Sequence, residues 1–356
     1  MKAIRIHGPR DARLDEIEEP VVTGDDQVKI RIESAGVCGS DLWLYETAPV
    51  PDHYRHPAFG ESGPHVLGHE MAGRVVLAGR AVTGLAAGDL VAVRPLVADG
   101  TCATCRRGET NLCEQRGFVG INGGGGGFSE YVVVPVEQVH RLPAPFTAAT
   151  GSLVEPLATS WHTVDAVPLT PEDPVLVVGA GPIGIGVLLC LRARGTTRVL
   201  VSEPSALRRG LAARWGAEVI DPRETDLARH ARAWSERRGV AAAFDCAGAG
   251  GEVIGSELRA LRPGGHLVVP AEFHARVEID PTELARHGKR ILGSSAYRRE
   301  DFDAVIRAVA DGRLDPTGMI TSTIALEDTV AAGLEHLLGA GRDTDIKVLV
   351  TAGTSS

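Results

Sequence analysis

Three closely spaced cysteines have the types and spacing of a metal-binding lobe. Cys102 and Cys105 form a C-x2-C pair, and Cys113 follows eight residues later. Thiolates at this spacing supply three of the four ligands of a tetrahedral zinc site, and Asp99, three residues before Cys102, can supply an oxygen as the fourth. The sequence therefore predicts a structural zinc site in a lobe at about 95–115. The alternative is a metal-free loop in which the loss of one thiolate has abolished binding.

A second set of candidate ligands is spread over the first 155 residues. Cys38 lies in the run GVCGSD, His69 and Glu70 lie in LGHE, and Glu155 opens EPLA. A thiolate, an imidazole and one or two carboxylates form a zinc set of the catalytic kind, in which three protein ligands leave the fourth position to water or substrate. Each residue alone is unremarkable, because a lone buried cysteine is ordinarily a core residue. The hypothesis of a catalytic zinc rests on their combination with the cysteine lobe.

A glycine-rich run after an apolar strand, expected at 175–178, indicates a dinucleotide site. Gly179 suits a tight turn, Gly181 lets the backbone approach a pyrophosphate, and Gly184 lets the following helix pack on the strand. The amino end of that helix offers unpaired N–H groups and a positive dipole end to an anion. The predicted cofactor-binding residues of this turn are Gly179, Gly181, Pro182, Ile183 and Gly184.

An acidic residue follows the next expected strand of the same region. This strand, at 198–202, ends in Glu203, about twenty residues past the glycines, where a carboxylate accepts hydrogen bonds from ribose hydroxyls. Glu203 would repel a 2′-phosphate, so the sequence favours NAD over NADP. Arg208 and Arg209, one helical turn further, can soften this preference; the simpler interpretation is a solvated helix face. Arg208 is nevertheless included among the predicted cofactor-binding residues.

Size and charge narrow the function classes. A chain of 356 residues predicts two domains. The formal charge of −9, from 37 basic and 46 acidic residues, argues against nucleic acid as a main partner, because no basic excess is present to neutralise phosphates. The sequence contains no apolar run long enough to span a bilayer, and its start lacks a signal-peptide core. The expectation is a soluble cytoplasmic protein that does not bind membranes.

The elements that must position these residues follow two different patterns. The first 150 residues predict a β-rich barrel or sandwich, with strands expected at 27–33, 71–76, 90–93 and 130–134. From about residue 174, strands and helices alternate, which is typical of a doubly wound parallel sheet. Its six strands are expected at 175–178, 198–202, 218–220, 241–246, 266–270 and 290–293. A helix at 302–310 and a strand at 347–350 follow, and the five-glycine run at 123–127 is interpreted as a flexible loop.

Taken together, these motifs resemble the zinc-dependent medium-chain alcohol dehydrogenases, in detail the butanediol and polyol dehydrogenase branch. The resemblance covers essentially the whole chain. It is carried by CGSD at 38–41, GHE at 68–70, the lobe at 99–113, VEPL at 154–157, the glycine run at 179–184, SEPS at 202–205 and ILGS at 291–294. It implies an α/β protein with a GroES-like catalytic domain at 1–158 and 297–356, and a Rossmann dinucleotide-binding domain at 159–296.

The resemblance also implies roles for single residues. Cys38, His69 and Glu155 would hold the catalytic zinc, directly or through water, and Glu70 would exchange with substrate or solvent at the metal. By the same resemblance, Asp41 orients His69, Ser40 takes the alcohol proton, and Lys347 lies near the cofactor pyrophosphate.

Two departures from the family pattern affect these expectations. The lobe begins with Asp99 where the family has cysteine, which bears on the structural zinc. Trp43 occupies the place of a proton-relaying histidine, and an indole, with a single N–H donor, cannot relay protons. The proton must then leave through cofactor ribose hydroxyls, water or Glu70. Trp43 instead forms either an apolar wall of the pocket or simple packing under the barrel.

The expected reaction is the NAD(H)-linked interconversion of a secondary alcohol and its ketone, with a small vicinal diol or acyloin as substrate. Polyols, cyclitols and threonine-type amino alcohols fit the same zinc site. A zinc-free quinone or enone reductase, and a non-enzymatic regulator that binds zinc or nucleotide, are the alternatives from other classes. The resemblance implies a homo-oligomer, either a dimer or a tetramer.

Overall fold

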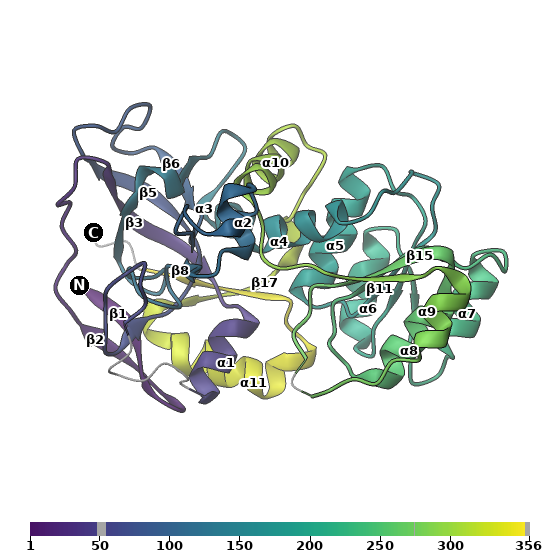
Figure 1. Ribbon diagram of the computed structural model, residues 1–356. Coiled ribbons are helices and arrows are strands. Elements are labelled where there is room, and N and C mark those ends of the chain that lie inside the picture. Colours follow the sequence, from purple (N-terminus) through teal and green to yellow (C-terminus); the bar gives the residue numbers. More distant parts are fainter. Residues whose placement is uncertain (48–54, 274, 353–356) are drawn as a thin grey trace. The chain divides into compact units, whose positions relative to one another are not determined.

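The chain folds into two compact units (Figure 1). The computed structural model describes residues 1–47, 55–273 and 275–352. The first unit comprises Met1–Glu155, Arg298–Asp311 and Pro316–Ser356, and the second comprises Pro156–Tyr297 and Gly312–Asp315. The C-terminal segment therefore belongs to the same unit as the first 155 residues.

The main sheet of the first unit is built around β3 (Gln27–Gly36). Its alternate residues Val28, Ile30 and Ile32 are buried, as expected of a strand with one face on a core. β3 pairs antiparallel with β5 (Glu70–Ala78) and with β18 (Lys347–Thr351) (Figure 1). The strand order is β10-β6-β5-β3-β18-β17, and β9 also pairs with β3. The other strands of this sheet are β6 (Leu90–Val93), β9 (Tyr131–Pro135), β10 (Val139–Arg141) and β17 (Ile320–Ala325).

Smaller elements complete the first unit, which confirms the β-rich prediction. Its two small sheets are β2 (Asp11–Glu16), β1 (Lys2–Gly8) and β4 (His65–Val66), and β7 (Leu96–Val97) with β8 (Gly117–Phe118). Its helices include α1 (Gly39–Thr47), α2 (Ala103–Arg106), α3 (Ala148–Ser152), α10 (Arg299–Ala310) and α11 (His336–Leu338). The predicted helix at 302–310 and strand at 347–350 correspond to α10 and β18.

The second unit is a six-stranded, wholly parallel sheet in the order β13-β12-β11-β14-β15-β16. This order confirms the predicted doubly wound dinucleotide-binding fold. The strands are β11 (Val175–Val178), β12 (Val199–Ser202), β13 (Glu218–Ile220), β14 (Val240–Asp245), β15 (Leu261–Val269) and β16 (Arg290–Gly293). The helices are α4 (Val154–Asp165), which begins at the boundary of the units, α5 (Pro182–Ala193), α6 (Ala206–Arg214), α7 (Leu227–Trp234), α8 (Gly251–Ala260) and α9 (Pro281–His287).

One strand begins earlier than the sequence pattern predicts. β15 was expected to start at residue 266, but it already pairs with β14 at Leu261. Its register shifts before the next pair, Ala242 with His266, so the residues between Leu261 and His266 form a bulge. The turn-like sequence Pro-Gly-Gly at 263–265 lies within this bulge and does not precede the strand.

The five-glycine run at 123–127 was interpreted as a flexible loop, and this interpretation is wrong for its second half. The N–H of Gly127 donates to the carbonyl of Gly68 at 2.6 Å, and both Gly126 and Gly127 are buried. A Cβ on Gly126 would lie 2.4 Å from the carbonyl oxygen of Leu67. The glycines are therefore required for close packing against the backbone that leads to His69.

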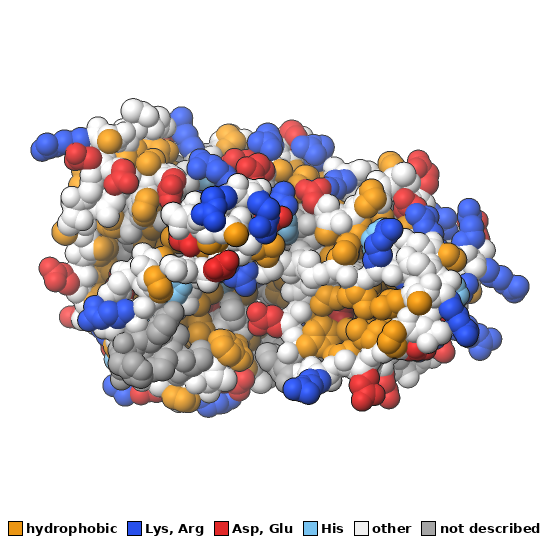
Figure 2. Space-filling view, viewed as in Figure 1, with side chains coloured by type: hydrophobic (Ala, Val, Ile, Leu, Met, Phe, Trp, Pro, Cys, Tyr) orange, Lys and Arg blue, Asp and Glu red, His pale blue; other side chains and the backbone are white. Residues whose placement is uncertain are grey.

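Acidic and basic side chains intermingle among the described residues on the face shown in Figure 2. Within the part of the chain that the structure describes, no helix combines the length and apolar character needed to cross a membrane.

Candidate metal and dinucleotide sites

The pairing of β3 with β5 brings the first set of candidate ligands together. Gly36, at the end of β3, lies opposite Glu70, at the start of β5. Cys38 follows β3 by two residues, and His69 immediately precedes β5, so both lie at the same end of this strand pair. Ligand atoms of Cys38, His69 and Glu70 all lie within 4.8 Å of one another. Three residues predicted as metal ligands from separate motifs thus form one buried or half-buried group.

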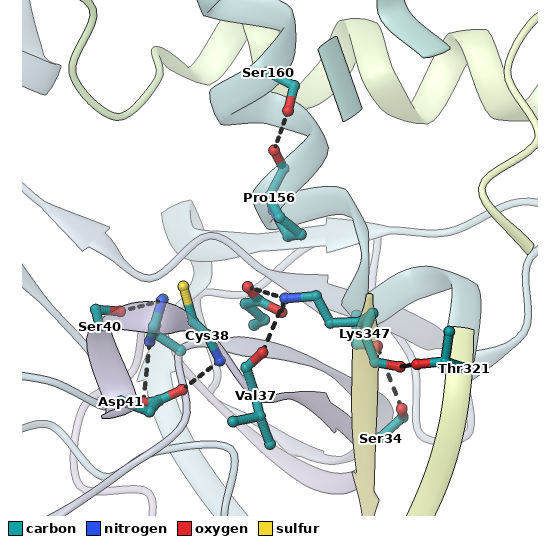
Figure 3. Close-up of polar contacts among 12 residues, drawn as sticks. Ser34, Val37, Cys38, Ser40, Asp41, Pro156, Ser160, Thr321 and Lys347 are labelled. Carbon is teal, nitrogen blue, oxygen red and sulfur yellow. Dashed lines mark hydrogen bonds and ion pairs between the residues drawn. The ribbon is translucent and has the colours of Figure 1, made fainter. Parts of the chain in front are cut away.

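Two side chains on α1 lie beside the His69 ring. Its Nδ1 lies 3.6 Å from Oδ1 of Asp41, and its Nε2 lies 3.3 Å from the hydroxyl of Ser40. The other oxygen of Asp41 accepts the backbone N–H of Cys38 at 2.9 Å, so the Asp41 carboxylate lies between the His69 ring and the backbone of Cys38 (Figure 3). Burial opposes protonation of His69, but the charges of Asp41 and Cys38 outweigh burial and raise the pKa of the imidazole well above its ordinary value. A cation is therefore favoured at this position.

Glu70 forms an enclosed ion pair with Lys347. The ammonium lies 2.7 Å from each carboxylate oxygen and donates a further hydrogen bond to the carbonyl of Val37 at 3.0 Å (Figure 3). Neither side chain has any exposed surface. Burial alone would lower the pKa of Lys347, but the charges of Glu70 and Cys38 raise it. The sequence-based expectation placed Lys347 beside the pyrophosphate; in the structure its ammonium is enclosed beside Glu70. The sequence held only a weak signal for this pair, a lysine that opens an apolar strand.

Glu155 lies near this group but outside it. The carboxylate is buried at the start of α4 and helps to raise the pKa of Lys347. The described residues within mutual ligand distance are Cys38, His69 and Glu70. The structure therefore brings Glu70, expected as an exchangeable ligand, closer to the cysteine and histidine than it brings Glu155.

The cysteine lobe forms a second group of ligand atoms. Asp99, Cys102, Cys105 and Cys113 also lie within 4.8 Å of one another. Backbone N–H groups point at the sulfurs: Cys113 Sγ accepts from Asp99 at 3.3 Å and Cys102 Sγ accepts from Cys105 at 3.5 Å. All four cysteine and aspartate side chains are thus arranged as electron donors around one point, which fits a divalent cation.

The lobe has its own electrostatic signature. Oδ1 of Asp99 accepts the N–H groups of Cys102 and Thr101, and these bonds lower the pKa of Asp99 to about 2. The Thr104 hydroxyl and backbone donors lower the pKa of Cys102 to about 6, whereas burial and the neighbouring thiols raise that of Cys105 to about 12. Crowded thiols resist simultaneous ionisation unless a cation compensates their charge.

The glycine turn of the second unit has the geometry that a pyrophosphate requires. Gly179 adopts a φ of +86°, and a Cβ on Gly184 would lie 1.9 Å from the carbonyl oxygen of Gly179. The nearest atom to a Cβ on Gly181 is an Arg208 nitrogen at 3.8 Å, so the space in front of this residue is open. Gly181 is the N-cap of α5 and has no capping side chain, and Pro182 follows in the first turn. The helix therefore presents free N–H donors.

Glu203 is fixed beside this turn. Its two oxygens accept the N–H groups of Ala180 and Ser205, each at 2.7 Å, and the side chain is buried. Each oxygen keeps a second lone pair for a ribose hydroxyl. Arg208 is half-buried beside Gly181, so the interpretation of a fully solvated helix face does not hold for it. Trp43 is 44% exposed on α1, which rules out simple packing under the barrel.

Comparisons with known proteins agree with this architecture. Residues 24–144 match the alcohol dehydrogenase GroES-like domain family, and residues 182–311 match the zinc-binding dehydrogenase family. The chain is 35% identical to the (R,R)-butanediol dehydrogenase of Bacillus subtilis over 98% of its own length and 99% of that protein. It is 34% identical to the L-threonine 3-dehydrogenase of Pyrococcus furiosus, over 87% of each chain.

Solved structures give the same result. The crystal structure of 2R,3R-butanediol dehydrogenase from Bacillus subtilis superimposes with a TM-score of 0.92 at 34% identity, covering 99% of both chains. A zinc-binding dehydrogenase from Sinorhizobium meliloti bound to NADP superimposes with a TM-score of 0.83 at 30% identity, covering 98% of both chains. The chain therefore belongs to the zinc-dependent alcohol dehydrogenases of the medium-chain dehydrogenase/reductase superfamily, which act on CH–OH groups.

Proposed function

We propose that the chain interconverts a secondary alcohol bearing a neighbouring hydroxyl or carbonyl with its ketone, using NAD(H). The enclosed group of Cys38, His69 and Glu70 is the observation that carries this proposal. The substrate class is supported by the similarity to the butanediol dehydrogenase of Bacillus subtilis and by 31% identity to a probable diacetyl reductase of Saccharomyces cerevisiae, over 99% of this chain and 90% of that protein.

Cys38, His69 and a carboxylate of Glu70 or Glu155 would hold the catalytic zinc, directly or through water. These residues fit the ion because they offer a thiolate, an imidazole and carboxylates at one buried point, where His69 without a metal is driven to bind a proton. When bound, zinc supplies Lewis acidity that makes an alcohol hydroxyl easier to deprotonate. Asp99, Cys102, Cys105 and Cys113 would hold a second, structural ion.

Ser40 is the proposed first proton acceptor. Its hydroxyl lies beside Nε2 of His69 and can accept one proton while it donates another. Asp41 faces Nδ1 of the same ring and so keeps Nε2 directed at the ligand group. The exposed Trp43 cannot carry the proton further, and Glu70 is enclosed, so we assign the onward path to water or to cofactor hydroxyls.

NAD is the proposed dinucleotide, held at Gly179, Gly181 and Gly184, and it supplies the hydride acceptor when bound. Glu203 would accept the ribose hydroxyls and repel a 2′-phosphate. Glu203→Ala is expected to shift the ratio of kcat/KM for NADP over NAD by about 10- to 100-fold, which corresponds to the loss of about 1–3 kcal/mol of discrimination. Titration of both dinucleotides against the free variant checks binding apart from turnover. An unchanged preference in both measurements would show that Glu203 is misassigned.

A screen of NAD reduction tests the substrate proposal. The expected order is (R,R)-2,3-butanediol first, with polyols, cyclitols and L-threonine behind. Threonine-type amino alcohols are the second candidate, on the strength of the similarity to the Pyrococcus enzyme. Faster turnover of L-threonine than of every diol would replace the proposal with that candidate, and activity toward enones or quinones that persists without metal would replace it with the zinc-free reductase.

We also propose that the chain forms a homo-oligomer, a dimer or a tetramer, by analogy with its family. Light scattering of the purified protein tests this, and a monomer at micromolar concentration would contradict it.

A further inference from the structure

Burial of the ion pair between Lys347 and Glu70 in the protein interior costs desolvation free energy. Both side chains are fully enclosed, so both charges have left water, and mutual attraction often fails to repay such desolvation. A buried ion pair is therefore weak support for a purely stabilising role. Its position beside Cys38 and His69 indicates a role in the chemistry of the metal group.

Three strands are shaped to make this pair. Glu70 comes from β5 and Lys347 from β18, and Gly36 of β3 leaves room between them. A Cβ at Gly36 would lie 2.0 Å from Oε2 of Glu70 and 3.2 Å from Cδ of Lys347. The third hydrogen bond of the ammonium goes to the carbonyl of Val37, the residue before Cys38. The pair is thus built into the segment that carries the thiol ligand.

Lys347 and a metal ion bound beside Cys38 would compete for the Glu70 carboxylate. Both carboxylate oxygens of Glu70 lie 2.7 Å from the ammonium, and ligand atoms of Glu70, Cys38 and His69 lie within 4.8 Å of one another. A divalent cation beside Cys38 and His69 would attract the same Glu70 carboxylate that Lys347 holds through both oxygens. One carboxylate therefore faces two cations, and whichever holds it decides how many protein ligands the metal has.

Resting on the proposed metal site, we propose that Lys347 is a positioning residue that holds the Glu70 carboxylate in reserve beside the metal. Glu70 becomes a ligand only when the ammonium releases it, and the open position otherwise stays available to substrate. Lys347 thereby lowers the metal affinity of the site and keeps a coordination position available to the alcohol.

The test compares metal binding by the full-length protein and Lys347→Met, which keeps the side-chain length and removes the charge. Freed from the ammonium, Glu70 is expected to move onto the metal, so that the variant binds Zn²⁺ at least about tenfold more tightly in competition with a chelator. In Co²⁺-loaded protein, addition of 2,3-butanediol is expected to change the visible absorption bands of the wild type and to leave those of the variant unchanged. Cys38→Ser identifies which bound equivalent, and which bands, belong to this site.

Three control variants make the test specific. Lys347→Arg keeps the charge and is expected to behave nearly as the wild type does. The double variant Lys347→Met with Glu70→Gln removes the carboxylate charge as well, and its metal affinity is expected to fall back to or below that of the wild type. Lys347→Gln still donates a hydrogen bond to Glu70, so it provides a folded protein without the charge if Lys347→Met does not fold, with a smaller gain in affinity.

The outcomes separate this inference from the proposed function. A wild-type protein that lacks a Cys38-dependent metal equivalent, or that oxidises no alcohol, refutes the proposed function. If the wild type passes both tests, but Lys347→Met and Lys347→Gln bind Zn²⁺ no more tightly than it does and still respond to the diol, the positioning role of Lys347 is refuted.

Discussion

In the first unit, two groups of candidate metal ligands each bring their ligand atoms within 4.8 Å of one another, but their surroundings differ. In the lobe, Asp99 to Cys113 span fifteen residues, and the sulfurs are oriented by their own neighbours' backbone N–H groups. In the other group, Cys38 and His69 are 31 residues apart and are brought together by the pairing of β3 with β5. Asp41, Ser40 and Lys347 surround this second group with further charge and hydroxyl chemistry.

The contrast matches the different requirements of a structural metal and a catalytic metal. A closed set of four protein donors, held by a local turn, suits an ion that only has to hold a loop together. A set of three donors, with a serine hydroxyl and a competing ammonium beside it, suits an ion that exchanges one ligand. Removal of one cysteine from each group should therefore affect different properties: activity for the Cys38 group and stability for the lobe.

The largest expected effect separates the two groups by function. Cys38→Ser is expected to lower kcat/KM by at least about 10³-fold, because the metal's contribution of several kcal/mol is lost at about 1.4 kcal/mol per tenfold. Cys105→Ser is expected to lower the melting temperature while the activity per folded molecule stays within about threefold. Metal analysis is expected to show the loss of one equivalent in each variant. Equal activity loss in both would erase the distinction.

A smaller effect is expected from Asp41, the carboxylate that faces His69 Nδ1. Asp41→Asn keeps the side-chain volume but removes the charge that faces Nδ1, so metal affinity or kcat/KM is expected to fall by about 10- to 100-fold. Glu46→Gln, an exposed carboxylate change on the same helix, is the matched control and is expected to alter neither. Kinetics and chelator competition on both variants check this. A loss shared by Glu46→Gln would point to the helix and not to the imidazole contact.

The aspartate in the lobe provides a test of ligand type. Asp99→Cys supplies a fourth thiolate, and we expect slower release of the lobe metal to a competing chelator than in the wild type. Asp99→Ala removes both the candidate ligand and the two bonds to the Thr101 and Cys102 N–H groups, so release is expected to be faster. Release rates that do not differ among the three proteins would mean that Asp99 is no ligand.

The last expected effect is on stability and not on activity, and it concerns a carboxyl group in the second unit. Glu257 is fully buried like Glu70, but its oxygens have no hydrogen-bond partner among the described residues; burial and then Asp245 raise its pKa to about 9. The unfolded chain releases this proton above its ordinary pKa, near 4.5, whereas the folded protein keeps it until about 9. This contribution to stability is therefore fully present below pH 4.5 and is lost as pH rises toward 9, by up to about 1.4 kcal/mol per pH unit.

Glu257→Gln, which is neutral and similar in size, is expected to flatten that part of the pH dependence. Denaturant unfolding from pH 5 to pH 9 on the wild type and the variant measures the difference. Parallel pH profiles would show that Glu257 does not hold its proton in the folded protein.

The features predictable from sequence are those encoded locally. The glycine turn depends on backbone freedom at Gly179 and close packing at Gly184, and the six strands follow from continuous apolar runs between helical patterns. The lobe follows from ligand spacing. The butanediol-branch resemblance supplied roles that spacing alone does not contain, such as those of Ser40 and Asp41.

The features that sequence could not predict depend on long-range register. The contact of Lys347 with Glu70 joins residues 277 positions apart, and it requires the C-terminal strand β18 to return beside β3. The packing of Gly126 and Gly127 against the backbone before His69 is likewise a tertiary contact. The glycine content alone predicts a flexible loop at this position. Strand boundaries at bulges, as in β15, also escape a pattern that counts only apolar residues.

Simultaneous measurement of metal content and turnover during exhaustive chelation tests the central claim most directly. If the Cys38 and His69 group holds the ion that activates the alcohol, turnover will fall in proportion to the equivalent that Cys38→Ser lacks, and it will return when Zn²⁺ is restored. Full turnover by protein from which that equivalent has been removed would contradict the account.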